Sequence, residues 1–309
     1  MHAIVGGMSG PRQTLVAITG ASGLIGSALR EDLLRDGIGV RVFVRRPPRS
    51  EHEIAWQPGA DVDTAALAGV TAVVHLAGAG VGDHRWTERY KATIRDSRVL
   101  GTGTIARAVA GMPRPPEVLV SASAIGYYGD TGDREVDESA PRGSGFLADV
   151  VGEWEAAAAP AAAAGIRVVH PRSGLVVSGR GGAWKRMFPL FRAGLGGRLG
   201  PGGQYWSWIS LRDEVAALRL LLDQPLSGPV NLTGPAAATN REVTAAMGDV
   251  MGRPTALPVP GFALRAALGE FSSEVLGSIR VRPAKLLEAG FRWQDPTIAD
   301  AIRAARAGW

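Results

Sequence analysis

One stretch near the N-terminus, residues 14–26 (TLVAITGASGLIG), constrains the fold more than any other. Its residues 15–18 form an apolar run typical of a buried parallel strand, and residues 24–35 have helical character. Three glycines accompany the change from strand to helix: Gly20, Gly23 and Gly26. Because glycine lets the backbone approach a ligand closely and a helix N-terminus offers free N–H groups, this arrangement favours a bound pyrophosphate. We therefore predict a dinucleotide-binding site, with an ordinary strand-to-helix turn as the alternative.

The next predicted strand indicates which dinucleotide binds. Residues 39–44 (GVRVFV) run directly into Arg45 and Arg46. This position lies about 20 residues past the glycines, where an acidic residue would bind the ribose 2′-hydroxyl and arginine would accommodate a 2′-phosphate. The two arginines thus favour NADP(H) over NAD(H), the alternative being an exposed basic strand end.

Strands and helices alternate through about residue 180, which predicts an α/β fold with a Rossmann-type doubly wound parallel sheet. Further strands are expected at 54–56, 71–76, 117–121 and 167–170, and helices at 86–110 and 148–164. Pro160 should interrupt the second of these helices. The strand at 71–76 ends in the small residues Ala77 and Gly78, which suits the crevice where ligands sit in open α/β sheets.

The alternation of strands and helices ends near residue 180. A glycine-rich segment at 194–203 is followed by predicted helices at 213–222, 240–252 and 263–270. This segment is either a lid over a pocket or a docked structural loop. We expect a loose N-terminal extension (1–13), a Rossmann domain (14–180, with 205–235 returning to it) and a substrate-side region (181–309). The last part of that region, 240–309, should form a small, mostly helical C-terminal domain.

Composition excludes several classes of protein and site. The chain has no cysteine, so disulfides, thiolate metal sites and cysteine nucleophiles are absent. Its net charge of +5 comes from scattered arginines rather than a basic stripe, so we expect no nucleic-acid partner. No apolar run approaches the roughly 20 residues that span a membrane, and the start does not resemble a signal peptide. These features suit a cytoplasmic protein without a membrane partner. The five histidines show no metal-ligand spacing, so no metal is expected.

Several segments together resemble the extended short-chain dehydrogenase/reductase (SDR) superfamily. The segments are TGASGLIG (19–26), HLAG (75–78), SASAIGYYG (121–129) and HPRSGLV (170–176), which contains Arg172. The chain is more closely similar to the sugar-nucleotide-epimerase-like subgroup of atypical extended SDRs, through segments at 85–102, 181–209 and 231–291. This resemblance implies an NADP(H)-binding Rossmann domain followed by a short C-terminal domain of unknown function. The epimerase label rests on likeness of fold and does not establish the chemistry.

The usual SDR catalytic pair is missing. The superfamily implies a tyrosine that exchanges a proton with the substrate, and a lysine four residues later that lowers its pKa. None of the four tyrosines, at 90, 127, 128 and 205, has a lysine at that spacing. Spacing from Ser123 puts the tyrosine position near Phe146 and the lysine position near Val150. The candidate catalytic residues are therefore Ser123 with Tyr127 or Tyr128, although tyrosines in a loop often have a purely structural role.

A second departure concerns Arg98, which stands where the resemblance to extended SDRs implies an asparagine. We predict that Arg98 contacts a phosphate or ribose of NADP(H) or another anionic ligand, the alternative being an ion pair on the helix surface. The predicted cofactor-binding residues are Gly20, Ser22, Gly23, Leu24, Ile25, Gly26, Arg45, Arg46, Leu76, Ala77, Gly78 and Arg98.

Two functions follow from these features. The first is an NADP(H)-dependent oxidoreductase or epimerase-like enzyme acting on a carbonyl or hydroxyl of a small-molecule or nucleotide-linked substrate. The second is a non-catalytic NADP(H)-binding sensor or scaffold. The absence of the tyrosine–lysine pair favours the sensor, whereas Ser123 and the lid-like glycine-rich segment, which Trp206 and Trp208 follow, favour the enzyme. The oligomeric state is left open, a homodimer being one option.

Overall fold

A parallel sheet forms the centre of the molecule in the computed structural model, which describes residues 14–309. The predicted N-terminal extension, 1–13, lies outside the described residues. Within these limits the sheet has eight strands, in the order β12-β8-β5-β4-β1-β2-β3 with short β6 beside β8. Their bounds are β1 Leu15–Thr19, β2 Gly39–Val44, β3 Glu53–Ala55, β4 Ala72–His75, β5 Val118–Ser121, β6 Ser123–Ala124, β8 Arg167–Ser173 and β12 Gly228–Leu232. The strand order reverses between β1 and β4, and ligands of such folds bind at that point.

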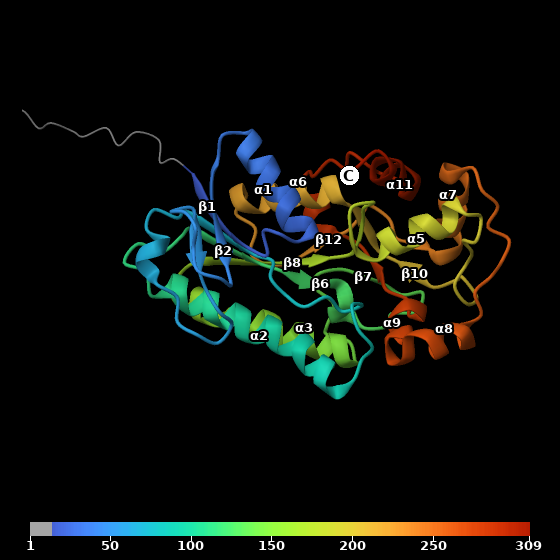
Figure 1. The fold of residues 1–309 in the computed structure, drawn as a ribbon, viewed down its shortest axis with the longest axis horizontal. Helices are drawn as coiled ribbons and strands as arrows, with labels where there is room; N and C mark the ends of the chain where they lie inside the picture. The colour runs from blue at the N-terminus through green and yellow to red at the C-terminus, as the bar shows by residue number, and fades with distance from the viewer. Residues whose placement is uncertain (1–13) are drawn as a thin grey trace, which may run out of the picture.

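Helices cover both faces of the sheet (Figure 1). One face carries α1 (Leu24–Arg35) and α6 (Leu211–Asp223). The other carries α2 (Glu88–Ala110), α3 (Phe146–Ala156) and the short α4 (Ala159–Ala163). The predicted Rossmann-type doubly wound sheet is therefore confirmed.

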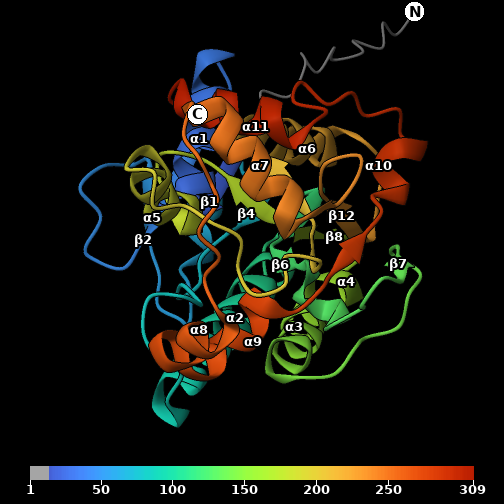
Figure 2. The same cartoon turned by 90° about the vertical axis from the view of Figure 1, so that its right-hand side faces the viewer.

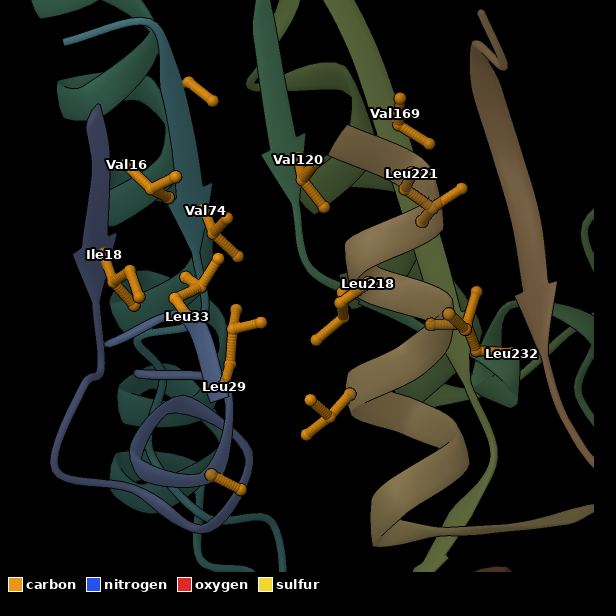
Figure 3. Packing of buried hydrophobic residues seen from close by; sticks show 14 of the residues in the cluster. Val16, Ile18, Leu29, Leu33, Val74, Val120, Val169, Leu218, Leu221 and Leu232 are labelled. Atoms are coloured by element: carbon orange, nitrogen blue, oxygen red, sulfur yellow. The ribbon is translucent and has the colours of Figure 1, made fainter. Parts of the chain in front are cut away.

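The core between the sheet and the first helix layer shows why these segments fold as they do. Val16, Ile18 and Val74 on the strands face Leu29 and Leu33 of α1, and all five side chains are buried (Figure 3). Alternate residues of the strand thus meet helix residues that are four positions apart. This packing buries one face of the sheet and one face of the helix. On the far side of this cluster, α6 packs Leu218 and Leu221 against β5, β8 and β12 (Figure 3).

A second, smaller lobe follows the sheet domain. It contains short strands and helices: β9 Leu175–Val177, α5 Gly182–Arg192, β10 Tyr205–Trp206, β11 Trp208–Ser210, β13 Ala238–Thr239, α7 Asn240–Met251, α8 Gly261–Leu268, α9 Ser272–Leu276, β14 Arg280–Val281 and α11 Ile298–Arg306. The short helix α10 (Ala284–Glu288) packs on β12 of the sheet domain. β14 pairs with β7 (Glu135–Val136), and the 3₁₀ turns are Thr64–Leu67, Ile125–Tyr128 and Gly269–Phe271. Trp206 and Trp208 are buried between α5, α7 and α11, so they are core residues here. The predicted mostly helical C-terminal part is present.

Two local details clarify the sequence-based expectations. The break between α3 and α4 falls at residues 157–158, and Pro160 is the second residue of α4, where a missing N–H costs little. The glycine-rich segment 194–203 is a docked loop. It forms bridges from Gly197 to Ala256 and from Leu199 to Val259, and the Leu199 N–H donates to Asn240 Oδ1 (2.8 Å).

Candidate functional site

A cleft of about 720 Å³ opens where β1 and β4 diverge. Its walls come from the turn before α1, the ends of β2 and β4, and α2. Its lining includes nine residues from these segments: Gly20, Ser22, Gly23, Arg30, Arg45, Arg46, Leu76, Ala77 and Gly78. Eight of these are predicted cofactor residues, and Arg30 is new. The structure thus brings together at one cleft segments that are far apart in the sequence.

The glycine turn is shaped so that no side chain fits. Gly20 has a φ of +67°, and a Cβ on it would lie 2.9 Å from the backbone of Leu76. A Cβ on Gly26 would lie 2.3 Å from the carbonyl oxygen of Gly20. Helix α1 begins with no side-chain cap, so the N–H groups of its first turn keep their capacity to bind an anion. Predicted residues Leu24 and Ile25 pack against the core instead of lining the cleft.

The opposite wall is held by a buried hydrogen-bond system that sequence reasoning missed. Thr19 Oγ1 accepts from the N–H groups of Leu76 (3.0 Å) and Ala77 (3.1 Å). The same hydroxyl lies 2.8 Å from His75 Nδ1. Burial lowers the pKa of His75 to about 4, so the ring is neutral. Because Thr19 Oγ1 already accepts two hydrogen bonds, the Thr19 hydroxyl donates to Nδ1 of that ring. The Thr19–His75 pair therefore fixes the end of β4 beside the glycine turn.

The arginines at the end of β2 differ in their surroundings. Arg46 donates two hydrogen bonds to the Glu53 carboxylate (2.7 and 2.6 Å). These bonds and the Arg49 backbone N–H lower the pKa of Glu53 to about 2. Arg45 and Arg30 have no carboxylate partner among residues 14–309. Arg30 lies two helical turns after Gly23 on α1. This spacing in the sequence could have indicated that Arg30 faces the same cleft.

Arg98 lies next to the cleft as a half-buried cation. Its Nη1 donates to the carbonyls of Ala79 (2.9 Å) and Ile94 (3.0 Å), and its guanidinium lies 5.0 Å from the Trp154 ring. The guanidinium carbon is 3.4 Å from the position that a Gly78 Cβ would take. Burial lowers the pKa of Arg98 to about 10. No ion pair to Arg98 exists in the described chain, so the alternative of a helix-surface ion pair is not what the structure contains.

A polar cluster lies at the carboxyl end of β5, beside β8. Ser123 Oγ donates to Glu155 Oε1 (2.6 Å). Arg172 binds both oxygens of the same carboxylate through Nε and Nη2 (2.8 Å each). The side chains of Arg172 and Glu155 are 3% and 14% exposed, so this is a nearly buried bidentate ion pair. Sequence reasoning identified Ser123 and Arg172 but not Glu155, which looks like one more surface charge on an alanine-rich helix.

The two candidate tyrosines have different environments in this cluster. Tyr128 is buried, donates to Asn231 Oδ1 (2.7 Å) and accepts from Arg172 Nη1 (3.0 Å). Burial raises the pKa of Tyr128 to about 12, against the opposing effect of Arg172. The Tyr127 ring centroid lies only 3.5 Å from the Arg172 guanidinium carbon, and its side chain is half-buried. The Tyr127 hydroxyl has no hydrogen-bond partner among the described residues.

The positions expected for the usual catalytic pair are apolar in space as well as in sequence. Val150 is buried beside Trp86 and Ile94. Phe146 contacts the Trp86 ring edge-on, at 5.0 Å between centroids. The nearest lysine, Lys91, lies 5.5 Å from the Phe146 ring and is paired with Glu88 and Glu270. Lys185 is exposed on α5. In the part of the chain that the structure describes, no group of three potential metal ligands occurs.

Comparison with known proteins gives two consistent family matches. The NAD dependent epimerase/dehydratase family matches residues 16–233, and a domain of unknown function, DUF1731, matches residues 259–305. An epimerase family protein of Mycobacterium bovis is 48% identical over 291 residues, covering 93% of this chain and 96% of that protein. A chloroplastic homolog of epimerase family protein SDR39U1 from Arabidopsis thaliana is 37% identical, covering 94% and 86%.

A solved structure agrees with these relatives. Human epimerase family protein SDR39U1, crystallised with NADPH, superimposes with a TM-score of 0.85 at 30% identity. The match covers 95% of this chain and 99% of that one.

Proposed function

The chain belongs to the NAD dependent epimerase/dehydratase family, and we propose that it is an NADP(H)-dependent oxidoreductase or epimerase-like enzyme acting on a carbonyl or hydroxyl group. When bound, NADP(H) supplies or accepts the hydride. The cleft fits this cofactor because Gly20 and Gly26 leave a cradle that a Cβ would fill, beside the uncapped first turn of α1. The presence of NADPH in the human SDR39U1 structure supports the choice of cofactor.

The observation that carries an enzymatic function is the cluster of Ser123, Glu155, Arg172 and Tyr127. A nearly buried bidentate ion pair adds little to the stability of a core, because removing both charges from water costs free energy and apolar residues of similar volume often stabilise as well. Such a pair is better explained by its effect on its neighbours. Glu155 accepts the hydrogen bond that the Ser123 hydroxyl donates, so the lone pairs of Ser123 are left to accept a hydrogen bond from a substrate hydroxyl. Arg172 holds the Tyr127 ring, whose hydroxyl keeps its capacity to exchange a proton.

We predict that Tyr127→Phe lowers the rate at which the protein reduces a carbonyl substrate by about a hundredfold. This is the low end of what general acid–base catalysis contributes. Tyr128→Phe should chiefly lower the midpoint temperature of thermal unfolding, because the Tyr128 hydroxyl donates a hydrogen bond to Asn231 and accepts one from Arg172. The measurement is NADPH oxidation against a panel of carbonyl compounds, with kcat and KM determined for any compound turned over. Equal turnover by Tyr127→Phe and the parent protein would remove Tyr127 from the reaction.

The arginines at the cleft give a prediction about cofactor choice. Arg45→Ala combined with Arg46→Ala should weaken NADPH binding by about ten- to a hundredfold, because a charge-assisted hydrogen bond is worth about 1.5–3 kcal/mol. NADH lacks the 2′-phosphate and should bind both proteins equally. Arg30→Ala should act in the same direction as the pair. A fluorescence titration with each dinucleotide gives the dissociation constants.

Two further variants sharpen this titration. Glu53→Gln should tighten NADPH binding several-fold, since it removes a negative charge and releases Arg46. Arg35→Ala is the matched control, because Arg35 is exposed on the same helix as Arg30 but pairs with Asp32. NADH binding as tight as NADPH binding would contradict the assignment to NADP(H).

One observation favours the second function, a non-catalytic NADP(H) sensor or scaffold. Phe146 and Val150 pack against Trp86 and Ile94, so the face that carries the tyrosine and lysine of other SDRs is apolar. NADPH binding without turnover across the carbonyl panel would support the sensor. Turnover that depends on Ser123 and Tyr127 would support the enzyme.

We also propose a domain organisation and a cellular location for the chain. The cofactor domain comprises residues 14–180 with 205–235, and residues 181–309 supply the substrate side, including the small domain 240–309. The residues 14–309 contain no helix long and apolar enough to cross a membrane. Together with the absence of cysteine, this is compatible with a cytoplasmic location, as proposed here.

A further inference from the structure

The small lobe exposes an unusual set of apolar side chains. The most exposed large hydrophobic residues of the described chain are all there: Leu190, Leu195, Leu257 and Phe262, with exposed fractions of 52%, 61%, 63% and 73%. Single exposed apolar residues need no explanation, whereas a group of them marks an interaction surface.

These four residues belong to segments that adjoin one another in space. The segment after α5 bridges to the segment after α7, at Gly197 with Ala256 and at Leu199 with Val259. The end of α5 is joined to the same region, because Arg253 Nε donates to the Arg192 carbonyl (3.0 Å). Figure 2 faces this side of the molecule, and the orange segment between α7 and α8 runs down it. We call the surface of residues 190–198 and 253–265 the lobe face.

The charged residues of the lobe face are all positive. Four exposed arginines lie within a few residues of the four apolar side chains: Arg192, Arg198, Arg253 and Arg265. Neither 182–203 nor 252–268 contains an aspartate or glutamate. No salt bridge within residues 14–309 neutralises any of the four. The face therefore combines unbalanced positive charge with exposed apolar side chains.

Helix α8 is the clearest sign that something covers this face. Its sequence, GFALRAAL, has a single charged residue, yet none of its residues is buried. A helix this apolar gains little by staying in water, because its stability in proteins comes from a buried apolar face. It packs on the adjoining 3₁₀ turn and α9, and Arg85 Nη2 donates to the Ala266 carbonyl (3.4 Å), but Phe262 stays outside these contacts.

We propose that the lobe face docks on an anionic lipid surface, with Phe262 and Leu257 inserted among the headgroups and the arginines held by lipid phosphates. Exposed apolar residues interleaved with arginine are what interfacial binding needs, from burial and from charge together. A second copy of the chain is a poor occupant, because two-fold pairing would set the arginines against one another. An acidic protein partner has the right charge, but four protruding side chains suit a soft interface better than a rigid one.

This docking differs from insertion across a bilayer. The sequence-based expectation of no membrane partner rested on the lack of a spanning segment, and such a segment is absent from residues 14–309. Surface attachment needs only the short apolar helix and its cations. The proposal is independent of the proposed oxidoreductase activity, since the lobe face shares no residue with the cofactor cleft.

Flotation of the full chain with lipid vesicles tests the proposal. Vesicles of equal parts phosphatidylglycerol and phosphatidylcholine should carry the protein, and pure phosphatidylcholine should not. The pair Phe262→Ser and Leu257→Ser should weaken binding at least about tenfold through lost apolar burial. The pair Arg198→Gln and Arg265→Gln should weaken it about 25-fold, or about fivefold for each charge.

Matched controls separate docking from general adhesion of a basic protein. Leu34→Ser with Leu100→Ser removes two apolar side chains of 49% exposure elsewhere, and Arg114→Gln with Arg134→Gln removes two exposed cations elsewhere. Both controls should bind vesicles like the parent, and all variants should bind NADPH normally. Binding that ignores Phe262 and Leu257 would overturn the proposal, as would equal losses in the controls. Absence of flotation with anionic vesicles, or self-association abolished by Phe262→Ser, would also overturn it.

Discussion

Replacement of Arg172 by methionine is expected to lower the free energy of unfolding by about 3–5 kcal/mol, the usual cost of leaving one member of a buried ion pair alone. The variant strands the Glu155 carboxylate, which keeps only Ser123 as a hydrogen-bond donor. It also removes the hydrogen bond to Tyr128 and the cation beside Tyr127. Chemical denaturation followed by fluorescence gives the change in unfolding free energy.

Two companion variants show whether the loss comes from the stranded charge. Arg172→Met with Glu155→Leu should recover most of the stability, because a buried pair can be replaced by apolar residues of similar volume. Glu153→Gln is the control on the same helix. Glu153 pairs with Arg95, but both side chains are almost half exposed, so about 1 kcal/mol or less is expected. If Arg172→Met costs no more than Glu153→Gln, the cluster does not behave as a buried ion pair.

The sheet and the cleft that we propose for the cofactor could be predicted because their signals are local. Each strand is a short apolar run, and the glycines act through backbone geometry within a few residues of one another. The close approach of Gly20 to Leu76 spans far more sequence, yet the order of strands in a doubly wound sheet predicts it. The residues Arg45 and Arg46 also lie beside the cleft, since the end of β2 adjoins the glycine turn.

Ser123, Arg172 and the two tyrosines of the polar cluster were identified from the sequence, but their contacts could not be predicted, because these are long-range and Glu155 and Asn231 look ordinary. Glu155 lies 32 residues from Ser123 and has Glu153 as a neighbour in sequence, but only Glu155 is turned inward. Asn231 lies 103 residues from Tyr128, on a strand of no particular polarity. Nothing in the sequence distinguishes Tyr127 from Tyr128 either. Their different surroundings arise from which hydroxyl is turned toward Asn231 and which ring lies nearest the Arg172 guanidinium.

Glu214 is the other buried carboxyl group with a large expected effect. It is 1% exposed at the start of α6, where Oε1 accepts from Ser173 Oγ (2.6 Å) and Oε2 has no partner among the described residues. Burial raises the pKa of Glu214 from 4.5 to about 7. Between these two values the folded protein holds more protons than the unfolded chain. The contribution of Glu214 to stability is therefore complete below pH 4.5 and is lost as the pH rises through 7.

The substitution Glu214→Gln should consequently change stability in a pH-dependent way. Relative to the parent, the variant should gain about 3 kcal/mol between pH 4.5 and pH 8, because a shift of one pKa unit corresponds to about 1.4 kcal/mol. The comparison cancels other titrating groups and any constant cost of burying the amide, so the difference between the two denaturation series isolates Glu214. Glu288→Gln, on the exposed side of α10, should give the same difference at both pH values. A Glu214→Gln difference that is equally flat would mean that water reaches the carboxylate, because a carboxylate that keeps its hydration has nearly the same pKa in the folded and unfolded states.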